Sequence, residues 1–423
     1  MFSRKLLNLS LLLALFSCST ERFTNTKNLS VSQPALAAQN TDSSSKFLGA
    51  IRSNIIPFTA NTESAIDTKS LAAFADRISN VRVLGLGEQT HGAGSVFSLK
   101  VELIKYLHQK HDFDLFILES GLYDVEKIYQ QAKKGQRIKD MAPGNIFYMY
   151  ANSEEVTPLF DYIDEQATTS NPLKLVGFDS QHTGKLSNKG LVADLSSALK
   201  KLDKKKVLSK DWSEFSNQIK KILNGSLVRM PLNDENAFFA QFDMLAEKFS
   251  SANEGFWFRI TKGLAAQAKR QWGIEDNRSL EMGENVKWWA EQFPDKKIIV
   301  WAHTWHLTKE GNKEVNAGQV ISEHFKEQYY MVHFTGEKGK YLDYVDMSLK
   351  EVESLTPNSL EGLISQYSSA PINFVDVTTL PLEKNKRTVF SNDYQQKLTS
   401  SEWGRYFDGV FILKNITPTA YLR

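Results

Sequence analysis

The sequence predicts an α/β protein in which helices flank both faces of a largely parallel sheet, with a long helical insertion acting as a lid. Three observations predict this fold class. Short, continuous apolar runs alternate with segments of helical periodicity, which is typical of parallel strands buried on both faces. Four of these runs end in a titratable side chain, at the strand ends where α/β proteins bind their ligands. A long stretch between two of the runs is helical in pattern.

The composition is that of an ordinary globular protein. Of the 423 residues, 41% are hydrophobic and 24% are charged, so the chain can bury a large core. Lys and Arg total 51 against 49 acidic residues, and removal of Arg4 and Lys5 with a leader would leave 49 against 49. A chain without net charge has no general electrostatic attraction to nucleic acid, so we expect no nucleic-acid partner.

The first element, residues 1–17, is predicted to be a lipoprotein signal peptide. Arg4 and Lys5 precede the apolar run Leu6–Phe16, which is too short to remain as a membrane-spanning helix. The run closes on the letters LFSC, which resemble a bacterial lipobox with cleavage before Cys18. Cys18 is the only cysteine of the chain, and the alternative is an ordinary secretory signal with an incidental cysteine. We expect acylation of Cys18 to anchor the exported protein to a bacterial cell-envelope membrane.

The segment 18–46 is predicted to be a disordered tether after the lipidated cysteine. It is rich in Ser, Thr, Asn, Gln and Ala and has no apolar period. The folded catalytic domain is predicted to span 47–423.

Five apolar runs are predicted to be strands of the sheet: Val81–Gly87, Leu115–Leu118, Leu173–Phe178, Ile298–Ala302 and Tyr330–Phe334. A helix beginning near Ser95 is expected after the first strand. The first four strands close on Glu88, Glu119, Asp179 and His303. Because charged side chains are disfavoured inside a sheet, these four are expected to converge on one crevice.

The insertion is predicted at about 184–293. It contains a lysine-rich part, Lys200–Lys210, expected to be a solvated helix face, and an aromatic part around Trp257 and Trp288. Such aromatic residues are more often core than ligand-binding groups, but the insertion returns to the sheet edge and is expected to cap the crevice. Residues 340–423 add helices and a final strand at Gly409–Leu413.

Two hypotheses fit the titratable residues. In the first, a neutral imidazole held by a carboxylate takes a proton from water as the water attacks an ester carbonyl, and a second imidazole or a cation stabilises the oxyanion. In the second, His91, Glu119, His303 and His306 bind a divalent ion such as Zn²⁺, which activates the water. The His303-x-x-His306 spacing is not the helical H-E-x-x-H motif. In a simpler alternative, Glu88 and Glu119 only cap helices.

The remaining histidines and the common catalytic motifs give weaker or negative evidence about function. A core or surface role is expected for His108, His111, His324 and His333, while His182 is left open because it follows Asp179 closely. The sequence has no G-x-S-x-G elbow, which disfavours a serine hydrolase. It also has neither a P-loop nor G-x-G-x-x-G.

Five segments, taken in order and spacing, resemble the erythromycin esterase family: LGEQTHG at 86–92, ILES at 117–120, GFD at 177–179, R-x-x-x-M-x-x-N at 278–285 and VWAHTWH at 300–306. The resemblance covers most of the chain from Phe47 onward. It implies the erythromycin esterase-like fold and hydrolysis that opens the macrolactone of macrolide antibiotics.

The resemblance also implies site residues. The catalytic set is Glu88, His91, Glu119, His303 and His306, with His91 as general base and the two glutamates orienting it or the water. The expected substrate-binding set is Lys100, Asp179, Arg278 and Asn285. Two positions depart from the family pattern: Lys100 stands where the resistance esterases have an arginine, and Ser279 where an aspartate is usual.

The combined interpretation is a cell-envelope lipoprotein that hydrolyses a small-molecule ester or macrolactone with water activated by His91. No cofactor is expected under the first hypothesis, and a divalent metal under the second. The membrane is expected to be a partner only through the lipid at Cys18. An alternative of another class is a non-catalytic lipoprotein that binds haem or another ligand through histidines near the sheet edge, since a related-looking group of α/β lipoproteins binds haem.

Overall fold

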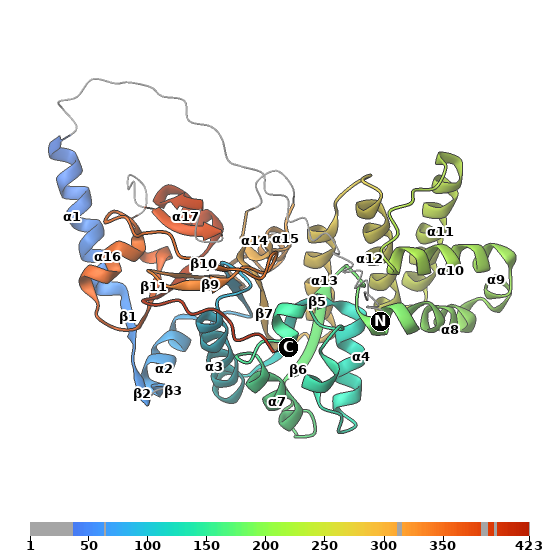
Figure 1. The fold of residues 1–423 in the computed structure, drawn as a ribbon, viewed down its shortest axis with the longest axis horizontal. Coiled ribbons are helices and arrows are strands. Elements are labelled where there is room, and N and C mark those ends of the chain that lie inside the picture. Colours follow the sequence, from blue (N-terminus) through green and yellow to red (C-terminus); the bar gives the residue numbers. More distant parts are fainter. Residues whose placement is uncertain (1–36, 63–64, 311–314, 382–387, 393–395, 423) are drawn as a thin grey trace, which may run out of the picture.

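The computed structural model describes residues 37–422 except 63–64, 311–314, 382–387 and 393–395. The predicted signal peptide 1–17 and Cys18 lie outside the described residues. Figure 1 shows a central sheet covered by helices and, beside it, a separate group of helices.

An eight-stranded sheet forms the centre of the molecule. In spatial order its strands are β1 (Ile55–Phe58), β11 (Ile372–Asp376), β14 (Gly409–Leu413), β8 (Tyr329–Gly336), β4 (Val83–Glu88), β7 (Lys297–His303), β5 (Phe113–Gly121) and β6 (Lys174–Asp179). The six strands from β14 to β6 are parallel, and β11 runs antiparallel to both of its neighbours. The largely parallel sheet predicted from the apolar runs is therefore confirmed, with each of the five predicted parallel strands in it.

Both faces of the sheet are buried because alternate side chains point to opposite sides. In β7, Ile299 and Trp301 belong to one hydrophobic core and Ile298, Val300 and Ala302 to the other. One face is covered by α2 (Thr68–Arg77), α3 (Gly94–His111), α4 (Leu122–Ala132), α5 (Ile138–Met141), α6 (Tyr148–Ala151) and α7 (Thr157–Gln166). The other is covered by α1 (Ala37–Asn54), α13 (Arg278–Gln292), α14 (Thr304–Leu307), α15 (Ala317–Phe325), α16 (Leu360–Tyr367) and α17 (Ser400–Tyr406).

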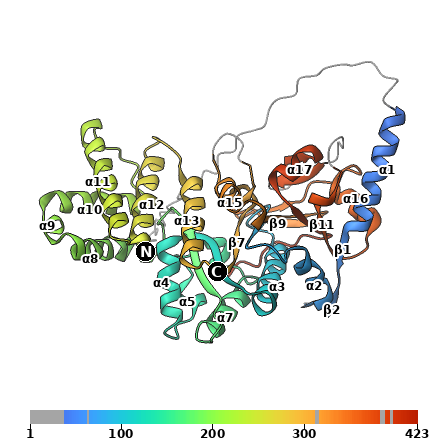
Figure 2. The ribbon, with the colours of Figure 1, turned by 180° about the vertical axis from the view of Figure 1, so that it is seen from behind.

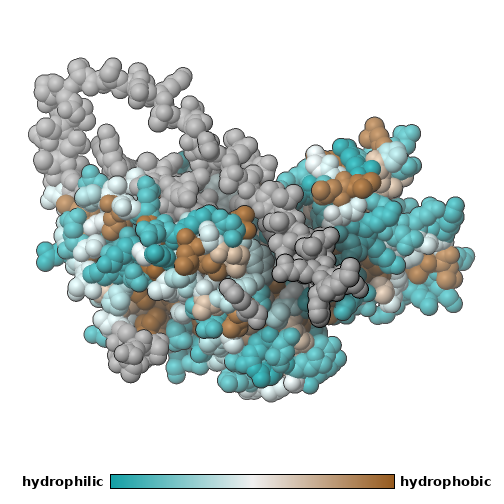
Figure 3. Space-filling view, viewed as in Figure 1, coloured by the Kyte–Doolittle hydropathy of each residue, from teal (hydrophilic) through white to brown (hydrophobic). Residues whose placement is uncertain are grey.

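The region predicted as an insertion forms a helical unit with its own core. It comprises η1 (Ser187–Leu191), α8 (Val192–Leu202), α9 (Lys204–Val207), α10 (Lys210–Leu223), α11 (Leu232–Ser251) and α12 (Gly255–Gln271). In Figure 1 and from behind in Figure 2, this unit extends sideways beyond the β6 edge of the sheet. Its surface is mostly hydrophilic, with apolar patches visible in Figure 3. The last helix of the predicted range, α13, packs on the sheet itself.

Part of the predicted tether is helical. Helix α1 begins at Ala37, so residues 37–46 are not the irregular chain expected from their composition. Phe47 and Ile51, one turn apart on this helix, are fully buried against the core, and this packing holds the helix where its propensity alone would not. No helix among the described residues has the length and apolarity needed to cross a bilayer.

The remaining short elements connect the sheet strands. Three antiparallel strand pairs form hairpins: β2 (Ala60–Thr62) with β3 (Ala65–Ile66), β9 (Lys340–Leu342) with β10 (Leu349–Glu351), and β12 (Thr388–Asn392) with β13 (Gln396–Thr399). Two turns of 3₁₀-helix are η2 (Lys326–Gln328) and η3 (Val377–Thr379). The Gly92 carbonyl accepts hydrogen bonds from the backbone N–H groups of Leu342 and Thr419, each at 3.0 Å. The turn after β4 is thereby tied to the end of β9 and to the C-terminal segment.

Candidate active site

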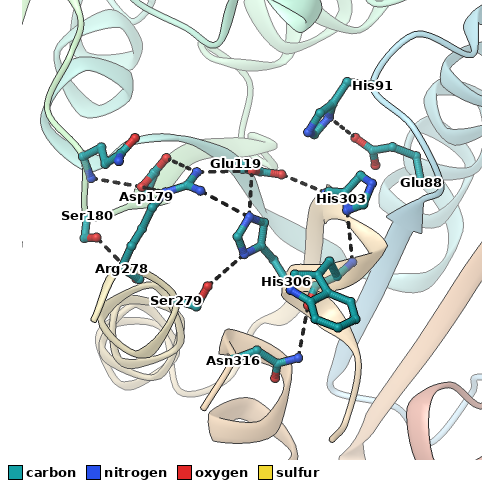
Figure 4. Close-up of polar contacts among 12 residues, drawn as sticks. Glu88, His91, Glu119, Asp179, Ser180, Arg278, Ser279, His303, His306 and Asn316 are labelled. Carbon is teal, nitrogen blue, oxygen red and sulfur yellow. Dashed lines mark hydrogen bonds and ion pairs between the residues drawn. The ribbon is translucent and has the colours of Figure 1, made fainter. Parts of the chain in front are cut away.

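The order of the strands places four predicted site residues side by side. Because β4, β7, β5 and β6 are neighbours and parallel, Glu88, His303, Glu119 and Asp179 reach the same edge of the sheet. Glu88 and His303 occupy paired positions on β4 and β7. Glu119 Oε2 accepts the backbone N–H of His303 at 2.8 Å, which joins β5 to the last residue of β7 (Figure 4).

A pocket of about 230 Å³ opens at this edge. It is lined by His91, Glu119, Ser120, Gly121, Gly144, Asn145, Ile146, Phe147, Tyr148, Asp179, Gln181, Thr183, Gly184, Arg270, Arg278, His303, His306 and Tyr344. One part of the wall is aromatic and another is charged. Six residues of the predicted set therefore line one pocket: His91, Glu119, Asp179, Arg278, His303 and His306.

His91 lies between the pocket and the carboxylate of Glu88. Its Nδ1 is 3.1 Å from Glu88 Oε1 (Figure 4), and Glu88 is fully buried. A carboxylate at Nδ1 favours the neutral tautomer that carries its proton there and its lone pair on Nε2. His91 is 6% exposed and lines the pocket. The pair thus has the arrangement of an oriented general base.

The Glu88 carboxylate is ionised by its surroundings. Burial alone would raise the pKa of Glu88, but the charge of Lys100 and the bond to His91 outweigh it and hold this pKa well below its ordinary value. Lys100 contacts Glu88 Oε2, and the Tyr150 hydroxyl donates to Oε1. Burial lowers the pKa of Lys100 to about 8, against the opposing effect of Glu88.

Lys100 does not have the position expected of a substrate-binding residue. It is fully buried, does not line the pocket, and donates to the Leu86 carbonyl at 2.8 Å as well as to Glu88. The reason is its place on the inner face of α3, which packs on the sheet beneath the turn that carries His91. Lys100 therefore acts on the pocket through Glu88.

His303 is held by two backbone groups. Its Nε2 is 2.9 Å from the Gln89 carbonyl oxygen, and its Nδ1 accepts the backbone N–H of Trp305 at 3.2 Å. This pattern assigns the neutral tautomer with the proton on Nε2. Burial and the neighbouring His91 lower the pKa of His303 to about 3. His303 is thus a neutral ring that joins the turns after β4 and β7.

Arg278 forms the charged side of the pocket. Its Nε and Nη2 donate to the two oxygens of Asp179 at 3.0 and 2.7 Å, which is a bidentate pair. Nη2 also lies 3.4 Å from Glu119 Oε1. Burial and Arg278 act in opposite directions on the pKa of Asp179, and the guanidinium prevails, so this pKa is lowered. The pKa of Glu119 is raised, because burial outweighs the attraction of His91 and Arg278.

His306 completes this cluster. Its Nε2 lies 3.4 Å from both Arg278 Nη1 and Glu119 Oε1, and its Nδ1 lies 3.0 Å from the Ser279 hydroxyl (Figure 4). Burial and the adjacent Arg278 hold the pKa of His306 well below its ordinary value. His306 is therefore neutral, and the Ser279 hydroxyl is the partner of its Nδ1.

Asn285 lies behind the pocket rather than in it. It is 1% exposed, accepts from Arg259 Nε at 2.6 Å and donates to the Phe178 carbonyl at 2.9 Å. From α13 the Asn285 side chain points at the carboxyl end of β6. The expectation that Asn285 contacts substrate therefore does not match the structure. Its role is to connect α12, α13 and β6.

The set proposed for a metal does not have a metal-binding arrangement. His303 uses both ring nitrogens on backbone groups, and His306 faces a guanidinium and a serine hydroxyl. Within the described parts of the chain, no three or more His, Cys, Asp or Glu side chains are grouped so that they could hold a metal ion. Binding of a divalent ion by His303 or His306 would require the ring to give up these partners.

The sequence did not single out several residues of the pocket. Phe147, Tyr148 and Tyr344 form its aromatic wall, and Arg270 reaches it from α12. The only local signal was the aromatic run Phe147–Tyr150, which has no spacing that distinguishes it from core. His182, left open above, is 1% exposed and does not line the pocket, although Gln181 and Thr183 on either side do.

Comparison with known proteins identifies the family. The family model described as erythromycin esterase matches residues 108–415. The candidate hydrolase YbfO of Bacillus subtilis (strain 168) is 27% identical over 412 residues, covering 85% of this chain and 89% of YbfO.

Solved structures share the fold. A succinoglycan biosynthesis protein has a TM-score of 0.72 at 17% identity, covering 92% of this chain and 100% of that one. A variant of the erythromycin esterase EreC in its open conformation has a TM-score of 0.66 at 17% identity, covering 86% and 98%. Since the family model matches most of the chain, this α/β protein belongs to the erythromycin esterase family of hydrolases.

Proposed function

We propose that this protein is a carboxylic ester hydrolase in which His91 activates water for attack on an ester or lactone carbonyl. The observation that carries the proposal is the His91–Glu88 pair, which lies at the wall of a pocket and has its carboxylate buried and ionised. An imidazole oriented in this way is suited to accept a proton near neutral pH.

In the proposed reaction, the water oxygen bonds to the carbonyl carbon while His91 Nε2 takes one water proton. Glu88 stabilises the imidazolium that results. When the tetrahedral intermediate collapses, the bond between the former carbonyl carbon and the ester oxygen breaks, and the proton passes from His91 to the leaving alkoxide. The products are an acid and an alcohol, or one hydroxy acid from a lactone. Arg278, which also lines the pocket, supplies positive charge for the oxyanion.

The helical unit is proposed to cover the pocket. Arg270 near the end of α12 and Thr183 and Gly184 just before η1 all line it, so both ends of the unit meet at the site. Macrolides and simpler lactones are the first substrates to test, because the family and EreC carry the name of erythromycin hydrolysis.

The test is a panel of macrolides, simple esters and lactones with purified protein. His91→Ala should lower kcat/KM for any substrate found by about 10²- to 10⁴-fold, which is the usual contribution of a general base. The matched control is His324→Ala on α15, which is exposed and outside the pocket. Turnover by His91→Ala equal to that of the control would exclude His91 as the base.

We also propose that the protein is exported and anchored through Cys18. The support is the lipobox-like end of the leader and the absence of any other cysteine from the sequence. Metabolic labelling with a fatty-acid analogue should mark the wild type and leave Cys18→Ser unlabelled. Equal labelling of both would reject the anchor.

A further inference from the structure

Tyr150 and His91 share one oxygen of Glu88. The Tyr150 hydroxyl donates to Oε1, the oxygen that also lies 3.1 Å from His91 Nδ1, and the hydroxyl is itself 3.3 Å from that nitrogen. Tyr150 is fully buried, and its ring packs against Phe97, Phe147 and Trp301 with centroids 5.2 to 5.6 Å apart. The hydroxyl is therefore held on the carboxylate by the packing of the ring.

We propose that Tyr150 is a positioning residue that sets the orientation and the basicity of His91 through Glu88. This inference rests on the proposed function of His91. A carboxylate oxygen that already accepts a hydroxyl proton attracts an imidazolium less strongly than one that serves the imidazolium alone. Because Oε1 already accepts the Tyr150 hydroxyl, it is a weaker partner for a protonated His91, and we expect the hydroxyl to lower the basicity of His91.

The effect on the basicity of His91 is assigned to Tyr150 and not to the other groups around His91. Those that face it are Glu88, Glu119, His303, His306 and Tyr344, and Lys100 lies behind Glu88. Lys100 contacts the other oxygen of Glu88, so a change at Tyr150 leaves that ion pair in place. Glu119 accepts the backbone N–H of His303, and His303 is tied to two backbone groups, so neither depends on Tyr150.

The experiment compares Tyr150→Phe with the wild type. The substitution keeps the ring and removes only the hydroxyl. The acid limb of the kcat/KM profile should move to higher pH by about half to one unit, which lowers activity on that limb about 3- to 10-fold and leaves the alkaline plateau near wild type. Without any substrate, the NMR titration midpoint of the His91 ring should rise by the same amount.

A matched control is Tyr162→Phe. Tyr162 is also buried, and its hydroxyl lies 2.5 Å from His108 Nδ1, away from the pocket. The Tyr162→Phe variant should leave the pH profile of kcat/KM and the titration midpoint of His91 unchanged. 3-Fluorotyrosine at position 150 keeps the packing and is a stronger donor, so it should move the His91 midpoint to lower pH even if Tyr150→Phe fails to fold.

The proposal is overturned by an unchanged His91 midpoint in both variants at position 150, or by a loss of activity that is equal at every pH. If the wild type cleaves no ester of the panel, the proposed hydrolase function fails. The NMR comparison still decides the role of Tyr150, because it uses no substrate.

Discussion

The ammonium group of Lys100 lies against the carboxylate of Glu88, and neither side chain exposes any surface. The same ammonium lies over the rings of Trp301 and Phe334, at 4.9 and 5.0 Å from their centroids. The negative charge that orients His91 is therefore balanced from behind, on the side away from the pocket. We expect the stability and the reactivity of the site to depend on this pair.

Lys100→Met should destabilise the protein strongly, because it leaves a buried carboxylate without its cation. The expected loss is about 3–5 kcal/mol of unfolding free energy, measured by urea denaturation. Lys105→Met on the same helix is the control. Lys105 is 30% exposed and 3.8 Å from Glu102, so its loss should cost less than about 1 kcal/mol. Equal stability of the two variants would show that the buried pair has no special role.

The Asp179–Arg278 pair should make stability depend on pH in the acid range. Because the folded-state pKa of Asp179 lies below its ordinary value of 3.8, the pair contributes its full stability above that value. The contribution is lost as the pH falls through the folded-state pKa. The difference in unfolding free energy between wild type and Asp179→Asn should therefore be constant near pH 6 and shrink below about pH 4. The exposed Asp211→Asn serves as control, and a difference independent of pH would contradict the assignment.

Gly92→Ala should disrupt the turn that carries His91. A Cβ atom at this position would lie 1.6 Å from the Leu342 carbonyl oxygen, which is backbone and has little freedom to move. We expect a loss of about 3 kcal/mol or more in thermal or urea unfolding. Gly49→Ala on α1 meets no atom within 4 Å and should instead stabilise by about 0.5–1 kcal/mol. If Gly92→Ala leaves the free energy of unfolding unchanged, β9 is able to move away from the turn.

Chelators should leave hydrolysis unaffected if His91 and Glu88 act as proposed. The nitrogens of His303 and His306 are already engaged by backbone groups, Arg278 and Ser279. Activity is measured before and after dialysis against EDTA, together with the metal content of the protein. Loss of activity that Zn²⁺ restores would favour the metal-dependent mechanism instead.

The predicted sheet and part of the predicted site follow from the sequence for a simple reason. Apolar runs of strand length that alternate with helices form parallel strands, and parallel strands bring their carboxyl ends to one edge. This placed Glu88, Glu119, Asp179 and His303 together, and His91 follows Glu88 closely in the sequence. The erythromycin esterase-like motifs pointed to the same residues.

The direction of individual side chains could not be predicted in this way. Lys100 lies on the helix after the His91 turn and Asn285 lies in the R-x-x-x-M-x-x-N segment, but the first points under the turn and the second behind β6. Tyr150 lies 62 positions after Glu88 in an undistinguished aromatic run, yet donates to its carboxylate. Such contacts depend on how α3, α6 and α13 pack on the sheet, which local periodicity does not specify.

By itself, therefore, the sequence determined the strand segments, their shared carboxyl edge and the pairing of His91 with Glu88, because these depend on local pattern and on parallel strand direction. Only the tertiary structure decided which groups surround Glu88, which histidines keep their nitrogens engaged, and that α1 begins ten residues before the expected core. Those features arise from long-range packing, where residues far apart in the chain compete for the same buried space.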